Sequence, residues 1–386
     1  MKITYVKPMA IKIPVEDTFG GKGLGEAGKR EYFPQPGWIG LYSRQIETMV
    51  VKIETDGGIV GFGEGQAPIG PEVTATVVDR VLRPILMGRD PMQGGVLRHE
   101  MYTAMNIRGH FTGFMLDAIS GVDSALWDIK GKRLGVPVYE LLGGAFRKEA
   151  PVYISGVRGN TAAEQAQTAR THVAEGFRTL KVFLGFGEEE DFERIRAVKE
   201  AIGSEGRLAV DVLWRYDIAT AVRYGLALER MGIAWFETPT DPEDIAGSAE
   251  IARALTIPVG NAETDRTREQ FLRWFQARGL DIAQPDVGRC GITEGRKIAD
   301  LAEAFHIPVS LHMGICSAPM IAASLHVAAS TPNFFLQEYQ PIMLEAANRF
   351  LKRPLVCERG AFRVPDGPGL GIEIDEEALK PYVVYP

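Results

Sequence analysis

From about residue 150 onward, short apolar runs rich in Val, Ile and Phe alternate with segments of helical periodicity. In the segment after the second run, Phe192, Ile195, Val198 and Ile202 lie three or four positions apart and Gly203 follows, which predicts an amphipathic helix and its end. Eight such runs are predicted strands: APVYISG, TLKVFLG, RLAVDVL, IAWFETP, IPVGNAET, LDIAQPD, IPVSLHM and NFFLQEY. Strand–helix alternation repeated eight times is typical of a parallel (β/α)8 barrel.

The N-terminal part of the chain has a different pattern, in which strands precede helices. The runs IETMVVKIET and IVGFGEG alternate apolar with polar residues and flank Asp56-Gly57-Gly58, which favours a hairpin. Helical stretches follow, including FMLDAISGVDSALWDIKGKRL. We therefore predict an α+β domain over 1–144 and a barrel over 145–350. Residues 351–386 lose the alternation and are expected to return to the first domain.

Polar residues end the predicted barrel strands at a constant spacing. A constant step of one strand–helix unit places the same position of successive strands at one height, the C-terminal rim, where active sites of such barrels form. Lys181, on the second predicted strand, is expected to face the same interior. The residues at this spacing form two series with steps of 26: Asp211, Glu237 and Glu263, then Asp286, His312 and Glu338.

The first series predicts a metal site. Three carboxylates on adjacent strand ends cannot all stay ionised at close range without a cation. A set of oxygen ligands of this number suits Mg²⁺, with water and substrate completing the octahedron. Asp211, Glu237 and Glu263 are therefore candidate Mg²⁺ ligands, and solvated or ion-paired surface acids are the alternative.

The second series predicts proton-transfer chemistry. Asp286 and His312 lie on neighbouring strands, so the carboxylate can hold one imidazole nitrogen and orient the other inward for general acid–base catalysis. The alternative for His312 is a structural histidine. Glu338 is expected to face the metal from across the site and, if protonated, to donate a hydrogen bond to a developing oxyanion. Its alternative is an ordinary rim acid.

Composition restricts the class of protein. Hydrophobic residues make up 45% and charged residues 24% of the 386 positions, which is ordinary for a soluble globular protein. The net charge of −7 argues against nucleic acid as a partner. There is no apolar run of about 20 residues and no signal-peptide core, so we expect no membrane association and a cytoplasmic location. The three cysteines are expected to be reduced thiols, and the 43 glycines to serve a lid and many turns.

Together these motifs resemble the mandelate racemase subgroup of the enolase superfamily. The resemblance covers essentially the whole chain and rests on VDV with Asp211, WFETP with Glu237, IPVGNAET with Glu263, QPDVGRCGI with Asp286, SLHM with His312 and FLQEYQ with Glu338. It implies a modified (β/α)7β barrel with an N-terminal α+β capping domain, and assembly as a homo-oligomer. It also implies that the three acids bind Mg²⁺, that the metal chelates a substrate carboxylate, and that a base removes the α-proton.

The chain departs from this family on two strands. Many relatives carry Lys-x-Lys on strand two, where the second lysine is a base. Here the run is Lys181-Val182-Phe183, so Phe183 takes the place of that base, and Lys181 matches the lysine that helps neutralise the substrate carboxylate. Strand six ends in Asp286 instead of a lysine, and Leu213 stands where some sugar-acid dehydratases add a histidine. One base, His312, remains, which disfavours a two-base racemase.

We therefore predict a Mg²⁺-dependent dehydratase of a sugar acid, an aldonate or aldarate. His312 removes the C2 proton and then protonates the departing C3 hydroxyl, which gives a 2-keto-3-deoxy acid. An isomerase on the same site is the nearest alternative, either a lactone cycloisomerase or an epimerase with an unrecognised second base. A catalytically silent barrel that binds a metal or a sugar acid is another.

The segment 19–44 is rich in glycine, charge and aromatic residues, and it is expected to form a mobile lid over the barrel mouth. Lys22, Lys29 and Arg30 are candidates for contact with a polyhydroxy acid, with a solvated loop as the alternative. Tyr216, after Trp214-Arg215, is a candidate pocket residue, with rim packing as the alternative.

Overall fold

The computed structural model describes residues 1–15, 30–34 and 38–385. Its largest part is a closed barrel of parallel strands, and the pairing of β13 with β6 closes it. This arrangement confirms all eight predicted strands. They are β6 (Glu149–Ser155), β7 (Thr179–Phe183), β8 (Arg207–Asp211), β9 (Phe236–Glu237), β10 (Val259–Asn261), β11 (Ile282–Ala283), β12 (Val309–Leu311) and β13 (Phe334–Tyr339).

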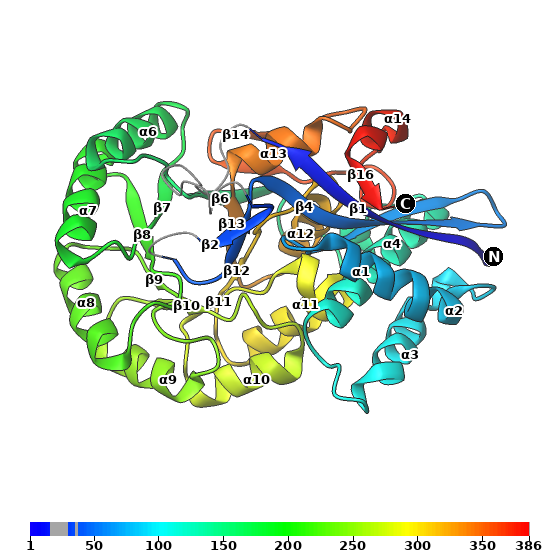
Figure 1. The fold of residues 1–386 in the computed structure, drawn as a ribbon, viewed down its shortest axis with the longest axis horizontal. Coiled ribbons are helices and arrows are strands. Elements are labelled where there is room, and N and C mark those ends of the chain that lie inside the picture. Colours follow the sequence, from blue (N-terminus) through cyan, green and yellow to red (C-terminus); the bar gives the residue numbers. More distant parts are fainter. Residues whose placement is uncertain (16–29, 35–37, 386) are drawn as a thin grey trace.

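Helices connect successive strands and cover the outside of the barrel (Figure 1). Several begin at an aspartate that accepts a backbone N–H of the first turn, as Asp217 does for α8 and Asp244 for α9. With seven helices between eight strands, the barrel is of the (β/α)7β type. The helices are α6 (Ala162–Ala174), α7 (Glu188–Ile202), α8 (Ile218–Arg230), α9 (Ile245–Ala254), α10 (Arg268–Ala277), α11 (Val287–Ala304) and α12 (Ala318–Ser330).

The cap is an antiparallel sheet with helices on one side of it (Figure 1). The sheet order is β16-β1-β4-β5, and the last strand of the chain, β16, therefore pairs with the first. The predicted hairpin at Asp56-Gly57-Gly58 joins β4 to β5, with Gly58 at φ 74°. The elements are β1 (Ile3–Pro14), β4 (Gln45–Thr55), β5 (Val60–Gly65), β16 (Val383–Tyr385), α1 (Pro71–Val77), α3 (Gly94–Asn106) and α4 (Phe114–Leu134).

Alternate glycines in β5 allow α4 to pack directly on the strand backbone. A Cβ built on Gly63 would lie 2.1 Å from the carbonyl oxygen of Gly121, and one on Gly65 would lie 2.0 Å from that of Asp117. Both distances are far below van der Waals contact, so only glycine fits there. The expectation that the glycine excess serves only a lid and turns is therefore incomplete, because part of it serves this helix–strand contact.

Cap and barrel are joined by buried polar contacts. Glu64, in β5, accepts hydrogen bonds from the backbone N–H of Ser317 and Met320 at the start of α12, at 2.6 and 3.0 Å. On the other side of the junction, Arg266 binds both carboxylate oxygens of Asp117 at 2.8 and 3.1 Å. These contacts hold the end of β5 over the barrel mouth.

After β13 the chain continues through α13 (Pro341–Asn348) into a hairpin of β14 (Cys357–Glu358) and β15 (Ala361–Arg363). Strand β15 pairs antiparallel with the start of β6, a contact that the sequence analysis did not predict. Within the described ranges, no helix is both long and apolar enough to span a bilayer.

Candidate active site

The structure brings the predicted rim residues together at one end of the barrel. Each of these side chains is at least nine-tenths buried. The parallel strands place them at one level, as the two series of 26-residue steps predict. Lys181 lies on β7, Asp211 ends β8, Glu237 ends β9, Glu263 follows β10, Asp286 follows β11, His312 follows β12 and Glu338 lies on β13.

The ammonium group of Lys181 lies among the acids. It donates a hydrogen bond to Glu237, and its Nζ is 3.2 Å from Asp211 Oδ2 and 3.3 Å from Glu338 Oε1. Burial by itself lowers the pKa of Lys181, but Glu237, Glu338 and Asp211 together raise it well above its usual value. Lys181 is therefore charged in the buried site, and its positive charge is shared among three carboxylates.

One ammonium does not neutralise this group of acids. Burial raises the pKa of Glu237 to about 8, and Asp211, Glu338 and Glu263 add to this increase, although Lys181 opposes it. Burial also raises the pKa of Glu263, with Asp211 and Glu338 contributing. Like charges at close range in a buried site have this effect unless a cation offsets them. The site is therefore short of positive charge.

His312 and Asp286 form the predicted dyad. Nδ1 of His312 lies 2.6 Å from Asp286 Oδ2, while Nε2 lies 3.4 Å from Glu263 Oε1 and 3.5 Å from Glu338 Oε2. The free nitrogen therefore points toward the acids. Burial lowers the pKa of His312, but Glu263, Glu338 and Asp286 raise it to about 10.

Glu338 differs from what the sequence analysis considered. It accepts the backbone N–H of Met313 at 2.8 Å and lies near both Lys181 and His312. Burial raises its pKa, but Lys181, His312 and the Met313 N–H outweigh burial and lower the pKa below its usual value. Glu338 is therefore a hydrogen-bond acceptor here, and its role as a donor to an oxyanion when protonated stays a prediction.

Strained backbone holds the strand ends that carry the acids. Four residues other than glycine have positive φ at these positions: Leu213 (52°), Trp214 (59°), Thr238 (46°) and Ala262 (78°). Hydrogen bonds support the strain, because Asp211 Oδ1 accepts the Leu213 N–H at 3.0 Å and the Thr238 hydroxyl at 2.6 Å. Conformations of this kind persist only where the surroundings impose them, and they cluster at functional sites.

The donor set at these strand ends fits Mg²⁺ in its chemistry. Asp211, Glu237 and Glu263 supply only oxygen, which is what Mg²⁺ prefers. Burial, with the neighbouring acids, raises the pKa of Glu237 and of Glu263, and a bound cation would oppose this effect. In this structure, however, Asp211 and Glu237 are ion-paired with Lys181. Over the described part of the chain, no three acidic, imidazole or thiol side chains converge as metal ligands, and Lys181 bonds to the acids.

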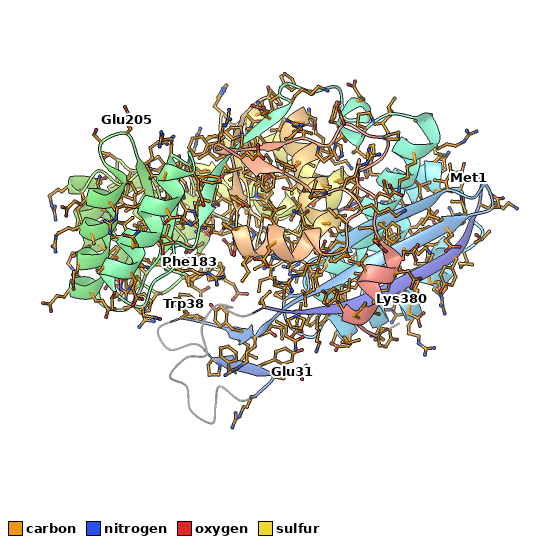
Figure 2. The ribbon with its side chains drawn as sticks, turned by 90° about the horizontal axis from the view of Figure 1, so that it is seen from above. Met1, Glu31, Trp38, Phe183, Glu205 and Lys380 are labelled. Atoms are coloured by element: carbon orange, nitrogen blue, oxygen red, sulfur yellow. The ribbon has the colours of Figure 1, made fainter. Side chains whose placement is uncertain are left out.

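An aromatic side chain, Phe183, stands at the position where the family resemblance led us to look for a second base. Phe183 lines the same pocket of about 190 Å³ as His312 and Lys181. The indole of Trp38 packs edge-on against Phe183, with ring centroids 5.7 Å apart, and the two lie close together in Figure 2. A phenyl ring accepts no proton, so this wall of the pocket has no basic side chain at the expected position.

Of the four predicted substrate contacts, the two that fall within the described residues, Arg30 and Tyr216, do not line the pocket. Lys22 and Lys29 lie outside the described residues, and Arg30 is exposed. Tyr216 is placed elsewhere: its hydroxyl donates to Asp191 at 3.3 Å and its ring packs against Tyr224. For Tyr216 the structure therefore shows the alternative, rim packing.

Several polar residues that the sequence analysis did not single out line the pocket, among them Gln66 and Arg289. Gln66 follows β5 of the cap, and its backbone N–H donates to Gly288 of α11 at 2.8 Å. No pattern along the chain predicts this contact. Arg289 gave no signal either, because it lies in a single turn that the non-helical Gly291 separates from the rest of α11.

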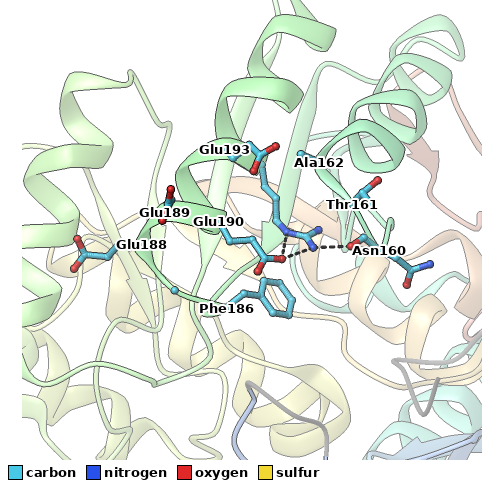
Figure 3. Close-up of a pocket in the computed structure, with 10 residues that line it drawn as sticks. Asn160, Thr161, Ala162, Phe186, Glu188, Glu189, Glu190 and Glu193 are labelled. Atoms are coloured by element: carbon cyan, nitrogen blue, oxygen red, sulfur yellow. Dashed lines mark hydrogen bonds and ion pairs between the residues drawn. The ribbon is translucent and has the colours of Figure 1, made fainter. Parts of the chain in front are cut away.

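A larger pocket, of about 660 Å³, lies beside the start of α7 (Figure 3). Acidic residues of α7 line it, and Arg194 spans it by binding Glu190 at 2.6 Å and the carbonyl oxygen of Asn160 at 2.8 Å. It contains none of the predicted site residues. The smaller pocket at the strand ends is therefore the candidate active site, because His312 and three of the predicted acids, Asp211, Glu263 and Glu338, line it.

Comparisons with known proteins agree with this geometry. Residues 33–143 match the mandelate racemase / muconate lactonizing enzyme N-terminal domain, and residues 162–378 match the enolase C-terminal domain-like model. D-galactarolactone cycloisomerase of Agrobacterium fabrum is 37% identical over 86% of this chain and 90% of its own. Arabinonate dehydratase of Saccharolobus solfataricus is 32% identical over 89% and 92%. A crystal structure of a racemase from Streptomyces coelicolor with bound magnesium superposes with a TM-score of 0.86, at 29% identity over 99% of this chain and 100% of that one. The chain belongs to the mandelate racemase / muconate lactonizing enzyme family of the enolase superfamily.

Proposed function

We propose that this protein is a Mg²⁺-dependent dehydratase of a sugar acid. One observation carries the proposal: the His312–Asp286 dyad faces the pocket from one side, and Phe183 occupies the position of the second base on the other. Single-base chemistry on one face suits elimination, because the same group can take and return a proton. It does not suit racemisation, which needs a proton donor on the opposite face.

The residues of the dyad account for each proton. Asp286 holds Nδ1 of His312 in the protonated form, so neutral His312 presents the lone pair of Nε2 to the C2 proton of the substrate. As the C2–H electrons form a double bond to C1, the acid becomes an enediol-type anion. Its collapse breaks the C3–O bond, and the imidazolium gives its proton to the departing hydroxyl, which leaves as water. The enol product then tautomerises to the 2-keto-3-deoxy acid.

Asp211, Glu237 and Glu263 would hold the Mg²⁺. When bound, the ion supplies positive charge at the substrate carboxylate, where negative charge develops. With these acids engaged by the ion, the ammonium of Lys181, which pairs with Asp211 and Glu237 here, would be available to the substrate carboxylate. Positive charge beside Glu263 also offsets one of the charges that raise the pKa of His312, which favours the neutral imidazole that a base requires.

Lactone cycloisomerisation is the second candidate, and the 37% identity to D-galactarolactone cycloisomerase favours it. The chemistry at the dyad begins in the same way, with removal of the α-proton by His312. In a lactone the leaving group is the ring ester oxygen, which departs as a carboxylate, so no water is lost and the product is an isomer. A carboxylate leaves without being protonated, so only dehydration needs the acid role of His312.

A screen in D₂O separates these functions. The protein is incubated with Mg²⁺ and a panel of aldonates, aldarates and aldarolactones, and products are followed by NMR and mass spectrometry. A dehydratase converts an open-chain acid to a 2-keto product that is lighter by one water, a cycloisomerase converts only a lactone, and an epimerase returns deuterated substrate isomers. His312→Asn should abolish turnover. Retained turnover in that variant, or no conversion and no exchange of any panel member by the wild type, would overturn the proposal.

A further inference from the structure

Arg289 carries an unused positive charge into the candidate active site. It lines the pocket, and its Nε is buried with no hydrogen-bond partner. Among the described residues, its guanidinium forms no hydrogen bond or ion pair; only its backbone N–H is bonded, to Asp286 at 3.2 Å. A buried donor without a partner costs free energy, so such groups call for an explanation.

The acids that surround Arg289 already have other partners. Its charge acts on two carboxylates, Asp117 and Asp265. Asp117 receives two hydrogen bonds from Arg266, at 2.8 and 3.1 Å, and Asp265 accepts the indole N–H of Trp274 at 2.6 Å. The guanidinium is therefore held near negative charge that keeps it in place, without being committed to either carboxylate.

A second unsatisfied polar group lies beside Arg289. Gln66 is buried and lines the same pocket, and its Oε1 has no hydrogen-bond partner. Its backbone N–H donates to Gly288, the neighbour of Arg289, at 2.8 Å. Cap and barrel thus bring an unpaired amide oxygen and an unpaired guanidinium to one side of the pocket, which suits a carboxylate with a hydroxyl next to it.

We infer that Arg289 binds the second carboxylate of a dicarboxylic sugar acid, with Gln66 accepting a hydrogen bond from an adjacent hydroxyl. This inference rests on the proposed function, since it assumes that the first carboxylate lies at the acid-rich end of the pocket. It narrows the substrate class from sugar acids in general to aldarates or their lactones. A planar guanidinium can bind a carboxylate through two parallel hydrogen bonds, whereas a terminal CH₂OH offers it only one oxygen.

Binding calorimetry tests this inference independently of turnover. Galactarate and galactonate differ only in the oxidation of C6, and glucarate and gluconate form a second such pair. Each is titrated with Mg²⁺ present into the His312→Asn protein, which binds substrate without consuming it. We expect the dicarboxylate of at least one pair to bind more tightly than its monocarboxylate. Adding Arg289→Gln should reduce that preference by about 10- to 100-fold, which is the contribution of hydrogen bonds between charged groups.

Two further variants keep the test specific. Arg289→Lys should lose less of the preference than Arg289→Gln, because the charge remains while the second hydrogen bond is lost. Lys297→Gln, an exposed charge removal on the same helix, should leave the preference within about threefold of the parent. Thermal unfolding shows whether each variant is folded, and Arg289→Lys carries the comparison if the Gln variant is not.

The inference is overturned if Arg289→Gln weakens both members of a pair equally, if it weakens neither, or if no dicarboxylate binds. Equal weakening would mean that the guanidinium supports the protein itself. Failure of this inference can be distinguished from failure of the proposed function. If the enzyme dehydrates aldonates and does not need Arg289, the proposed function stands and the inference about Arg289 is refuted. If aldarates bind in an Arg289-dependent way but are not turned over, the inference stands and the proposed function is refuted.

Discussion

Replacing Asp286 with asparagine tests the dyad with almost no change in volume. Asp286 Oδ2 lies 2.6 Å from His312 Nδ1, and its Oδ1 accepts the N–H of Arg289 at 3.2 Å. Asparagine can still cap the helix, but it carries no charge to stabilise an imidazolium. It can also turn an N–H toward Nδ1, which selects the wrong tautomer of the imidazole. The variant therefore impairs proton transfer and spares the fold.

The expected loss follows from what the carboxylate does. Positioned acid–base groups contribute about 10²- to 10⁴-fold to a rate, so kcat should fall by that factor, equivalent to about 3–5 kcal/mol in the barrier. The free energy of unfolding should change by no more than about 1 kcal/mol, because the helix cap is kept. Steady-state kinetics on an active panel member and urea unfolding measure the two quantities.

Asp217→Asn is a matched control. Asp217 also caps a barrel helix, and its Oδ1 accepts the N–H of Thr220 at 2.8 Å, but its carboxylate binds Thr220 and no imidazole. The Asp217→Asn variant should be as stable as Asp286→Asn and should keep full activity. If Asp286→Asn keeps kcat within threefold of the wild type, or if both variants lose activity equally, the orientation of His312 by Asp286 is refuted.

Three further predictions concern other parts of the molecule. Glu237→Gln should weaken Mg²⁺ binding at least tenfold by calorimetry; unchanged affinity would contradict the metal assignment. Burial lowers the pKa of His326 to about 4, so the free energy of unfolding should be highest above pH 6.5 and should decrease as the pH falls toward 4, by about 2 kcal/mol at pH 5. Urea unfolding at pH 7 and 5 should show this decrease in the wild type and not in His326→Gln. Gly63→Ala should cost about 1–3 kcal/mol or more, because its Cβ would meet the Gly121 carbonyl, whereas Gly95→Ala, with open space around its Cβ, should not destabilise; equal unfolding midpoints would refute the packing argument.

The strands and the ring of site residues were predictable from local patterns. Each strand is a short apolar run, and a parallel barrel repeats its geometry once per strand–helix unit. Residues 26 apart, such as Asp286 and His312, therefore end adjacent strands and form a direct parallel bridge in the structure. The replacement of a second base by Phe183 was predictable for the same reason, since alternate residues of a strand share a face.

Contacts between distant segments were not predictable in this way. Gln66 reaches the pocket only because Glu64 anchors the end of β5 to α12, a contact between residues more than 250 positions apart. Lys181 was expected to meet a substrate carboxylate, yet in the ion-paired state it binds Glu237, because charge balance among buried groups depends on all of them together. Arg289 gave no signal in the sequence, because the acids near it, Asp117 and Asp265, belong to distant segments of the chain.

The charge of the pocket bears on the inferred preference for a dicarboxylate. Apart from the His312–Asp286 pair, four buried carboxylates face one ammonium, and the ammonium of Lys181 is occupied by three of them, so the acid-rich end disfavours an anion until a divalent cation is present. Arg289 stands outside that balance, because no described carboxylate pairs with it. A monocarboxylate thus gains attraction only where the cation binds, whereas a dicarboxylate is attracted at both ends. If Arg289 binds as we infer, the discrimination between the two depends on the cation at one end and on Arg289 at the other, even in a protein with a net charge of −7.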